Sequence, residues 1–86
     1  MKVHASICIK TPIQVPFHYV HTKALELSLK GIINIRDNQW LIQLEGKTTA
    51  VNEFVQMMGH IAEFSEIEME INQTLHHFET LTINVV

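Results

Sequence analysis

Histidine is the residue type with the clearest capacity for chemistry in this sequence, because it can bind a metal or transfer a proton near neutral pH. The chain has six histidines. His18 and His21 stand three residues apart and could share one face of a helix, while His76 and His77 are adjacent. Paired histidines can bind zinc or copper, but a structural zinc site needs four ligands and usually includes cysteine. No metal site is predicted, and a metal-handling domain is an alternative hypothesis.

The other polar residues form none of the motifs that define common enzyme classes. There is no nucleophile motif, no Walker-type phosphate loop and no dinucleotide fingerprint. Glu66, Glu68 and Glu70 alternate with apolar residues, which is typical of the solvated face of a strand. No histidine stands at a fixed spacing from them, so we assign them no acid–base role. No cofactor is predicted.

Composition places the chain among globular proteins and argues against several partners. It has 86 residues, 47% of them apolar and 17% charged, with a formal net charge of -3. The absence of a basic stripe argues against nucleic acid, and no apolar run reaches the roughly 18 residues of a membrane helix. Cys8 is the only cysteine, which fits a buried position in a reducing compartment. We expect one cytoplasmic domain over residues 1–86; the sequence does not indicate its oligomeric state.

A predicted β-hairpin over residues 31–46 organises the chain. Its first arm is rich in β-branched isoleucine, and its second arm alternates apolar and polar residues from Trp40 to Glu45. Asp37 and Asn38, between the arms, are typical of tight turns. Because a lone hairpin is barely stable in water, the remaining elements must cover it.

Three further strands are predicted from apolar residues at every second position, the period of a strand with one buried face. Their apolar residues are Val3, Ala5, Ile7 and Ile9 near the start, Ile67, Met69 and Ile71 later, and Leu81, Ile83 and Val85 at the end. The three glutamates of residues 66–70 discourage edge-to-edge pairing. Residues 72–77 are interpreted as a polar loop.

Two helices are predicted from apolar residues that recur every three to four positions. The first begins near residue 18 or 19 and runs to Leu29, with Gly31 as its stop. The second is capped by Thr48 or Thr49 and stops at Gly59. Its apolar face consists of Val51, Phe54, Val55 and Met58.

The order β-α-β-β-α-β with a final strand predicts an α+β fold. Pro12 and Pro16 interrupt the pattern after the first strand, so residues 10–17 are expected to form a loop. The order is that of the ferredoxin-like split βαβ sandwich, an antiparallel sheet with two helices on one face. Right-handed crossovers place both helices on the same side, which leaves the other face more polar.

On these residues the chain resembles the acylphosphatase family over nearly its whole length. That family has a loop reading roughly Val-Gln-Gly-Val-x-Phe-Arg, where this chain has Ile-Gln-Val-Pro-Phe-His at residues 13–18. The family's Leu-x-Gly-Trp-Val-x-Asn corresponds, with one residue fewer, to residues 29–34, and its terminal Phe-x-x-Phe-x-Ile to residues 78–83. The resemblance implies a ferredoxin-like sandwich and metal-free hydrolysis of acyl phosphates.

The resemblance also implies where a substrate phosphate would bind. In the family, loop amides wrap the phosphate, a loop arginine clamps it, and an asparagine orients the attacking water. The loop positions are Gln14, Val15, Phe17 and His18, and the catalytic positions are His18 and Asn34. Asn34 could equally be a polar residue on an exposed strand face. A phosphate-bearing small molecule is the partner that this site implies.

The loop departs from the family pattern at two features that matter for catalysis. It has no glycine, so positive φ angles become costly, and Pro16 has no N–H to donate. His18 stands in place of the arginine, and a neutral imidazole offers one donor and no permanent charge. We therefore expect hydrolysis to be weak or lost. The alternative is a non-catalytic module that binds a small molecule or a protein, since fold does not imply function.

Overall fold

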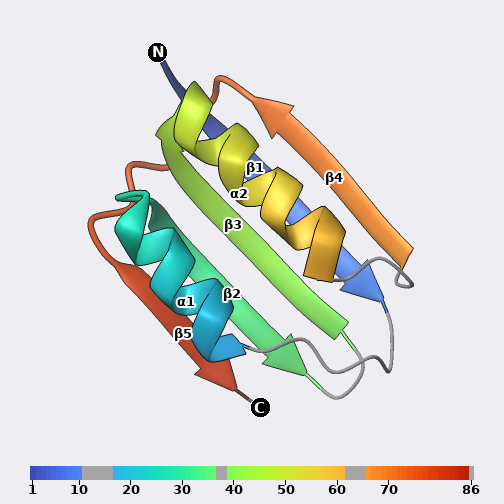
Figure 1. Ribbon diagram of the computed structural model, residues 1–86. Helices are drawn as coiled ribbons and strands as arrows, with labels where there is room; N and C mark the ends of the chain where they lie inside the picture. The colour runs from blue at the N-terminus through green and yellow to red at the C-terminus, as the bar shows by residue number, and fades with distance from the viewer. Residues whose placement is uncertain (11–16, 37–38, 62–65, 86) are drawn as a thin grey trace.

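The computed structural model describes residues 1–10, 17–36, 39–61 and 66–85 (Figure 1). Its elements are β1 (Lys2–Lys10), α1 (Phe17–Glu26), β2 (Lys30–Arg36), β3 (Gln39–Lys47), α2 (Thr48–Ile61), β4 (Glu66–Asn72) and β5 (Leu81–Val85). This order of strands and helices confirms the predicted α+β, ferredoxin-like pattern with one additional strand at the end.

The five strands form one sheet in the order β4-β1-β3-β2-β5. The neighbouring pairs β4–β1, β1–β3 and β3–β2 are antiparallel, and β2–β5 is parallel. The sheet is therefore mixed, whereas the sequence predicts an antiparallel one. The reason is the last connection, which leads from β4 at one edge to β5 at the other. The last residue of β4 lies at the same end of the sheet as the first residue of β2. Because the connection starts there, β5 runs in the same direction as β2.

Both helices cover the same face of the sheet, as predicted (Figure 1). The side chains between the two layers are almost entirely apolar. They include Val3, Ala5, Ile7 and Ile9 of β1, Ile33 of β2, Ile42 and Leu44 of β3, Val20 and Ala24 of α1, and Val51, Phe54 and Met58 of α2. Each strand residue in this set alternates with one on the opposite face, here called the open face, where polar side chains predominate.

The end of α1 differs from the prediction, because Ser28 rather than Gly31 terminates the helix. Ser28 has a left-handed backbone, with φ 57°. The N–H of Ser28 donates to the Leu25 carbonyl and the N–H of Leu29 to the Ala24 carbonyl, both at 3.0 Å. These two bonds define a Schellman cap, whose left-handed position is usually glycine. Leu29 then points into the core, 1% exposed.

The two glycines that sequence reasoning placed after helices have other positions. Gly31 lies inside β2 with φ 152°, and a Cβ there would lie 1.8 Å from the Gln43 carbonyl oxygen of β3. Glycine is therefore needed at this position for the close approach of two strand backbones. Gly59 lies within α2, which continues to Ile61, and a Cβ there would meet no atom within 4 Å.

Two predicted connections lie at least partly outside the described residues. They are residues 11–16 of the loop after β1 and the turn at Asp37 and Asn38; residues 62–65 after α2 also lie outside. Neither of the two described helices is long and apolar enough to cross a membrane.

Candidate functional site

The predicted phosphate-binding residues are only partly within the described chain. Gln14 and Val15 lie outside it, and Phe17 is the first residue of α1. His18 follows in the first turn of α1 and its side chain is exposed. The N-terminal turn of a helix offers unpaired N–H groups to an anion, which is compatible with the predicted role of His18. That role stays a prediction.

Asn34 lies on the open face of β2. It alternates with Ile33, which is buried under the helices, so its side chain points away from α1, the helix that carries His18. The Asn84 side-chain amide of β5 donates a hydrogen bond of 3.0 Å to the Asn34 Oδ1 atom. The structure thus places the two predicted catalytic residues in different layers, and the water-orienting role of Asn34 also stays a prediction.

A buried ionisable pair that sequence reasoning missed lies near the other end of the open face. His4 of β1 and Glu45 of β3 are direct partners in the strand ladder, and they are 3% and 6% exposed. The His4 Nδ1 and Glu45 Oε2 atoms are 2.8 Å apart. A buried charge of this kind is tolerated only when it is paired and hydrogen-bonded.

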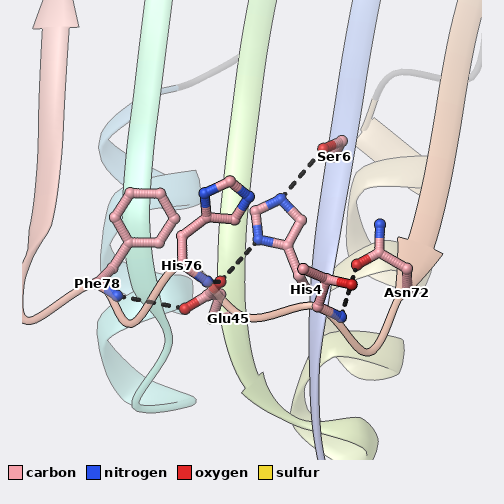
Figure 2. A network of polar contacts seen from close by, with 7 residues as sticks. His4, Ser6, Glu45, Asn72, His76 and Phe78 are labelled. Carbon is pink, nitrogen blue, oxygen red and sulfur yellow. Dashed lines mark hydrogen bonds and ion pairs between the residues drawn. The ribbon is translucent and has the colours of Figure 1, made fainter.

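The segment between β4 and β5 supplies the remaining partners of Glu45. The backbone N–H groups of His76 and Phe78 both donate to its carboxylate, the latter at 3.3 Å (Figure 2). His77 between them has φ 59°, a left-handed conformation that turns successive N–H groups toward one anion. Burial raises the pKa of Glu45, but these hydrogen bonds and His4 outweigh it, so the pKa lies below its ordinary value of 4.5.

Aromatic rings from the same segment cover His4. The His76 ring packs beside the His4 ring at an interplanar angle of 40°, with their centroids 4.6 Å apart, and the Phe78 ring stacks at 5.7 Å from His76 (Figure 2). These rings shield the imidazole from water on that side. The consequence is a fixed orientation for His4, because its ring is held by a carboxylate at one nitrogen and by packing on its face.

The second nitrogen of His4 faces a serine. The His4 Nε2 and Ser6 Oγ atoms are 3.2 Å apart, and Ser6 is half-buried two residues further along β1 (Figure 2). The lowered pKa of Glu45 keeps its carboxylate ionised, so it can only accept, and Nδ1 must carry the hydrogen. A carboxylate, an imidazole and a hydroxyl are therefore connected in series.

The sequence carried one weak signal for this cluster. His4 is a polar residue in an alternating strand, and Glu45 lies near the end of another strand. Which residue faces which depends on the register between β1 and β3, and the two partners are 41 positions apart. The pair could therefore be recognised only after the register was known.

The metal alternative depends on a set of ligands that lie close together. Within the described ranges, no group of three or more histidine, cysteine, aspartate or glutamate side chains is placed to hold a metal ion.

A second feature is a cavity of about 550 Å³ at the end of the sheet, beside the C-terminal end of α1 and the segment between β4 and β5. Its lining includes Lys2, Lys30 and Lys47, together with His77 and Phe78. Lys2 and Lys47 are direct partners across β1 and β3, and Lys30 is the partner of Glu45 across β2 and β3. The register thus brings half of the six lysine and arginine residues of the chain to one cavity.

Known proteins resemble this chain in structure but not detectably in sequence. No family model matches the chain and no curated protein matches it. Among solved structures, acylphosphatase from Bacillus subtilis superposes with a TM-score of 0.79 and 25% identity, over 94% of this chain and 97% of that one. Acylphosphatase from Coxiella burnetii gives a TM-score of 0.79 at 12% identity, over 96% and 93%.

A different class of protein shares the same arrangement. The dark-state structure of BlrB, a BLUF protein, superposes with a TM-score of 0.79 and 16% identity, over 98% of this chain and 72% of that one. At this identity the likeness concerns the fold and not the ligand. With both acylphosphatases matched over nearly their whole length, the chain has an acylphosphatase-like fold.

Proposed function

We propose that this acylphosphatase-like domain hydrolyses the carboxyl–phosphate bond of acyl phosphates only weakly or not at all. The observation that carries the proposal is the separation of His18, in the helical layer, from Asn34, on the open face. A phosphate clamp and a water-orienting amide must converge on one phosphorus atom to accelerate its hydrolysis. The Asn34 Oδ1 atom, moreover, already accepts a hydrogen bond from the Asn84 side-chain amide.

The chemistry available at the start of α1 supports the same conclusion. The only arginine of the chain is Arg36 at the end of β2, and His18 stands where the family has its clamping arginine. A guanidinium binds phosphate through two parallel N–H bonds, which an imidazole cannot reproduce. Because loss of a single donor to a developing anion already costs about 3 kcal/mol, loss of both the arginine and the loop glycine leaves little catalysis.

The test is hydrolysis of benzoyl phosphate, followed by its ultraviolet absorbance, for the native chain and for His18→Arg. For the native chain we expect turnover that is weak or indistinguishable from the uncatalysed rate. Arg36→Gln is the matched control. It removes the guanidinium at the end of β2 and leaves His18 unchanged. Native turnover that falls at least tenfold in both His18→Ala and Asn34→Ala would contradict the proposal, since those residues would then form a working site.

A second candidate function is favoured by the lysine-lined cavity. We propose that it binds a small molecule bearing a phosphate group. Lys2 and Lys47 are like charges placed directly opposite each other, an arrangement that destabilises a sheet unless an anion neutralises it. The Glu45 carboxylate also lines this cavity, but it is a single negative charge beside three lysines and therefore offsets their charge only in part.

Calorimetric titration with inorganic pyrophosphate tests this binding function. We expect binding that weakens as salt is raised and that falls at least tenfold in Lys30→Gln or Lys47→Gln. Lys23→Gln is the control, because Lys23 lies in α1 and does not line the cavity. Equal affinity in the Lys23, Lys30 and Lys47 variants would show non-specific attraction and would overturn the assignment.

A further inference from the structure

Glu45, His4 and Ser6 form a linear array in which each group contacts the next. The Glu45 Oε2 to His4 Nδ1 distance is 2.8 Å and the His4 Nε2 to Ser6 Oγ distance is 3.2 Å. We propose that this array is an acyl-transfer site for small carboxylic esters, with Ser6 as the nucleophile, His4 as the general base and Glu45 as a positioning residue. This site is independent of the function proposed above, because it uses neither His18, Asn34 nor the lysines.

The geometry meets the requirements for activating a serine. A hydroxyl becomes a useful nucleophile when a base within hydrogen-bond reach accepts its proton and a third group orients that base. The ionised Glu45 fixes the hydrogen of a neutral His4 ring on Nδ1. The unprotonated Nε2 then faces the Ser6 hydroxyl. The roles are recognised by this geometry and not by the order of the residues in the chain.

The reaction proceeds in two balanced steps. The Ser6 oxygen attacks the ester carbonyl carbon while its proton passes to His4 Nε2. The tetrahedral intermediate collapses, the alcohol leaves with that proton, and the acyl group remains on the Ser6 oxygen. Water then attacks the acyl carbon while His4 accepts its proton. The bond from the acyl carbon to the Ser6 oxygen breaks, His4 returns the proton to that oxygen, and the carboxylic acid is released. During both steps Glu45 stabilises the positive charge that forms on the imidazole.

Ser6 is reachable from solvent through a shallow cavity of about 350 Å³ on the open face. Gln43 is the direct partner of Ser6 across β1 and β3, and Asn34 lines the same cavity. The Gln43 side-chain amide is the donor available to an oxyanion that forms beside Ser6, because strand backbone N–H groups are engaged in the ladder. A cavity of this volume is at the small end of ligand sites, which favours short acyl groups.

The charged side chains around Ser6 further restrict the range of expected substrates. Glu70 is its direct partner on β4, and Glu68 lines the same cavity. Two carboxylates beside the nucleophile repel a negatively charged ester and attract a cationic one. The expected substrates are therefore uncharged or cationic esters, in contrast to the anionic ligands expected at the lysine-lined cavity.

The decisive experiment is acylation by p-nitrophenyl acetate, with the acetyl group located by tandem mass spectrometry. We expect an adduct on Ser6, no adduct at this position in Ser6→Ala, and acylation slowed by about 10² to 10⁴ in His4→Gln. Thr82→Ala is the matched control, because it removes a hydroxyl from the same face at the exposed strand β5. Acetylation confined to Cys8 or lysines, or equal Ser6 labelling in His4→Gln, would overturn the proposal.

Two further measurements separate catalysis from a purely structural role. Ser6→Cys keeps a side chain of similar size and should still be acylated. Its acylation rate should depend on His4 in the same way as that of the native chain. In the native chain the acylation rate should fall in acid, because general-base catalysis requires an unprotonated base. The titratable groups facing His4 are Glu45 and His76, with Lys2, Lys30, Lys47 and Glu70 nearby on the same face. If His4→Gln does not fold, Ser6 labelling that is independent of pH overturns the proposal.

Discussion

His4 and Glu45 lie directly opposite each other on β1 and β3 and are joined by a 2.8 Å hydrogen bond in a nearly solvent-free position. The same carboxylate also holds the backbone of His76 and Phe78, which belong to the segment that crosses from β4 to β5. One side chain thus connects the central strands to the connection between the two edge strands.

Replacing Glu45 should therefore be far more damaging than replacing an exposed glutamate. Glu45→Ala leaves the His4 ring and two backbone N–H groups without an acceptor, and we expect a loss of about 3 to 5 kcal/mol of unfolding free energy. The control is Glu68→Ala, whose ion pair with Lys10 at 3.7 Å is exposed and should contribute less than about 1 kcal/mol. Urea denaturation measures both, and similar losses would refute this ranking.

Acid should remove the stabilisation that Glu45 provides. Its pKa lies below 4.5 in the folded chain, so the unfolded state binds the proton more tightly. The contribution is complete above the unfolded pKa and is lost as the pH falls through the folded value. The gap in unfolding free energy between the native chain and Glu45→Gln should narrow below pH 4.5. A gap that stays constant in urea titrations from about pH 7 to about pH 3 would show that the carboxylate charge contributes nothing.

Two glycines should respond oppositely to the same substitution. Gly31→Ala forces a Cβ against the Gln43 carbonyl oxygen at a φ that alanine rarely adopts, so we expect a loss of at least about 3 kcal/mol. Gly59→Ala places its methyl group in open space within α2 and should stabilise the chain by about 0.5 to 1 kcal/mol. Thermal denaturation of both variants measures these changes in stability. Equal effects would mean that the close approach of β2 and β3 is not what requires Gly31.

Sequence periodicity was sufficient to predict the elements, since Val3 to Ile9 alternate and Val51, Phe54 and Met58 recur at helical spacing. It was not sufficient for features that depend on contacts between distant residues. Termination of α1 at Ser28 is stabilised by the cap hydrogen bonds, although serine has no special preference for a left-handed backbone. The direction of β5 depends on where the preceding segment crosses the sheet.

The candidate sites also differ in whether they could be predicted from the sequence. The resemblance of residues 13–18 to a phosphate-binding loop could be read from the sequence, as could the absence of its glycine and arginine. The Glu45–His4–Ser6 array could not, because it depends on the β1–β3 register and on the backbone that folds over it. Isolated polar residues acquire neighbours only through such long-range pairing.

The most direct test of the central claim is the kcat/KM of the native chain for benzoyl phosphate beside that of a competent acylphosphatase under the same conditions. Loss of the clamping arginine and of the loop glycine predicts a value at least about a thousandfold lower, or no detectable turnover. A value within tenfold of the competent enzyme would contradict the account, because it would mean that a loop ending in His18 supplies the transition-state stabilisation that we infer is missing.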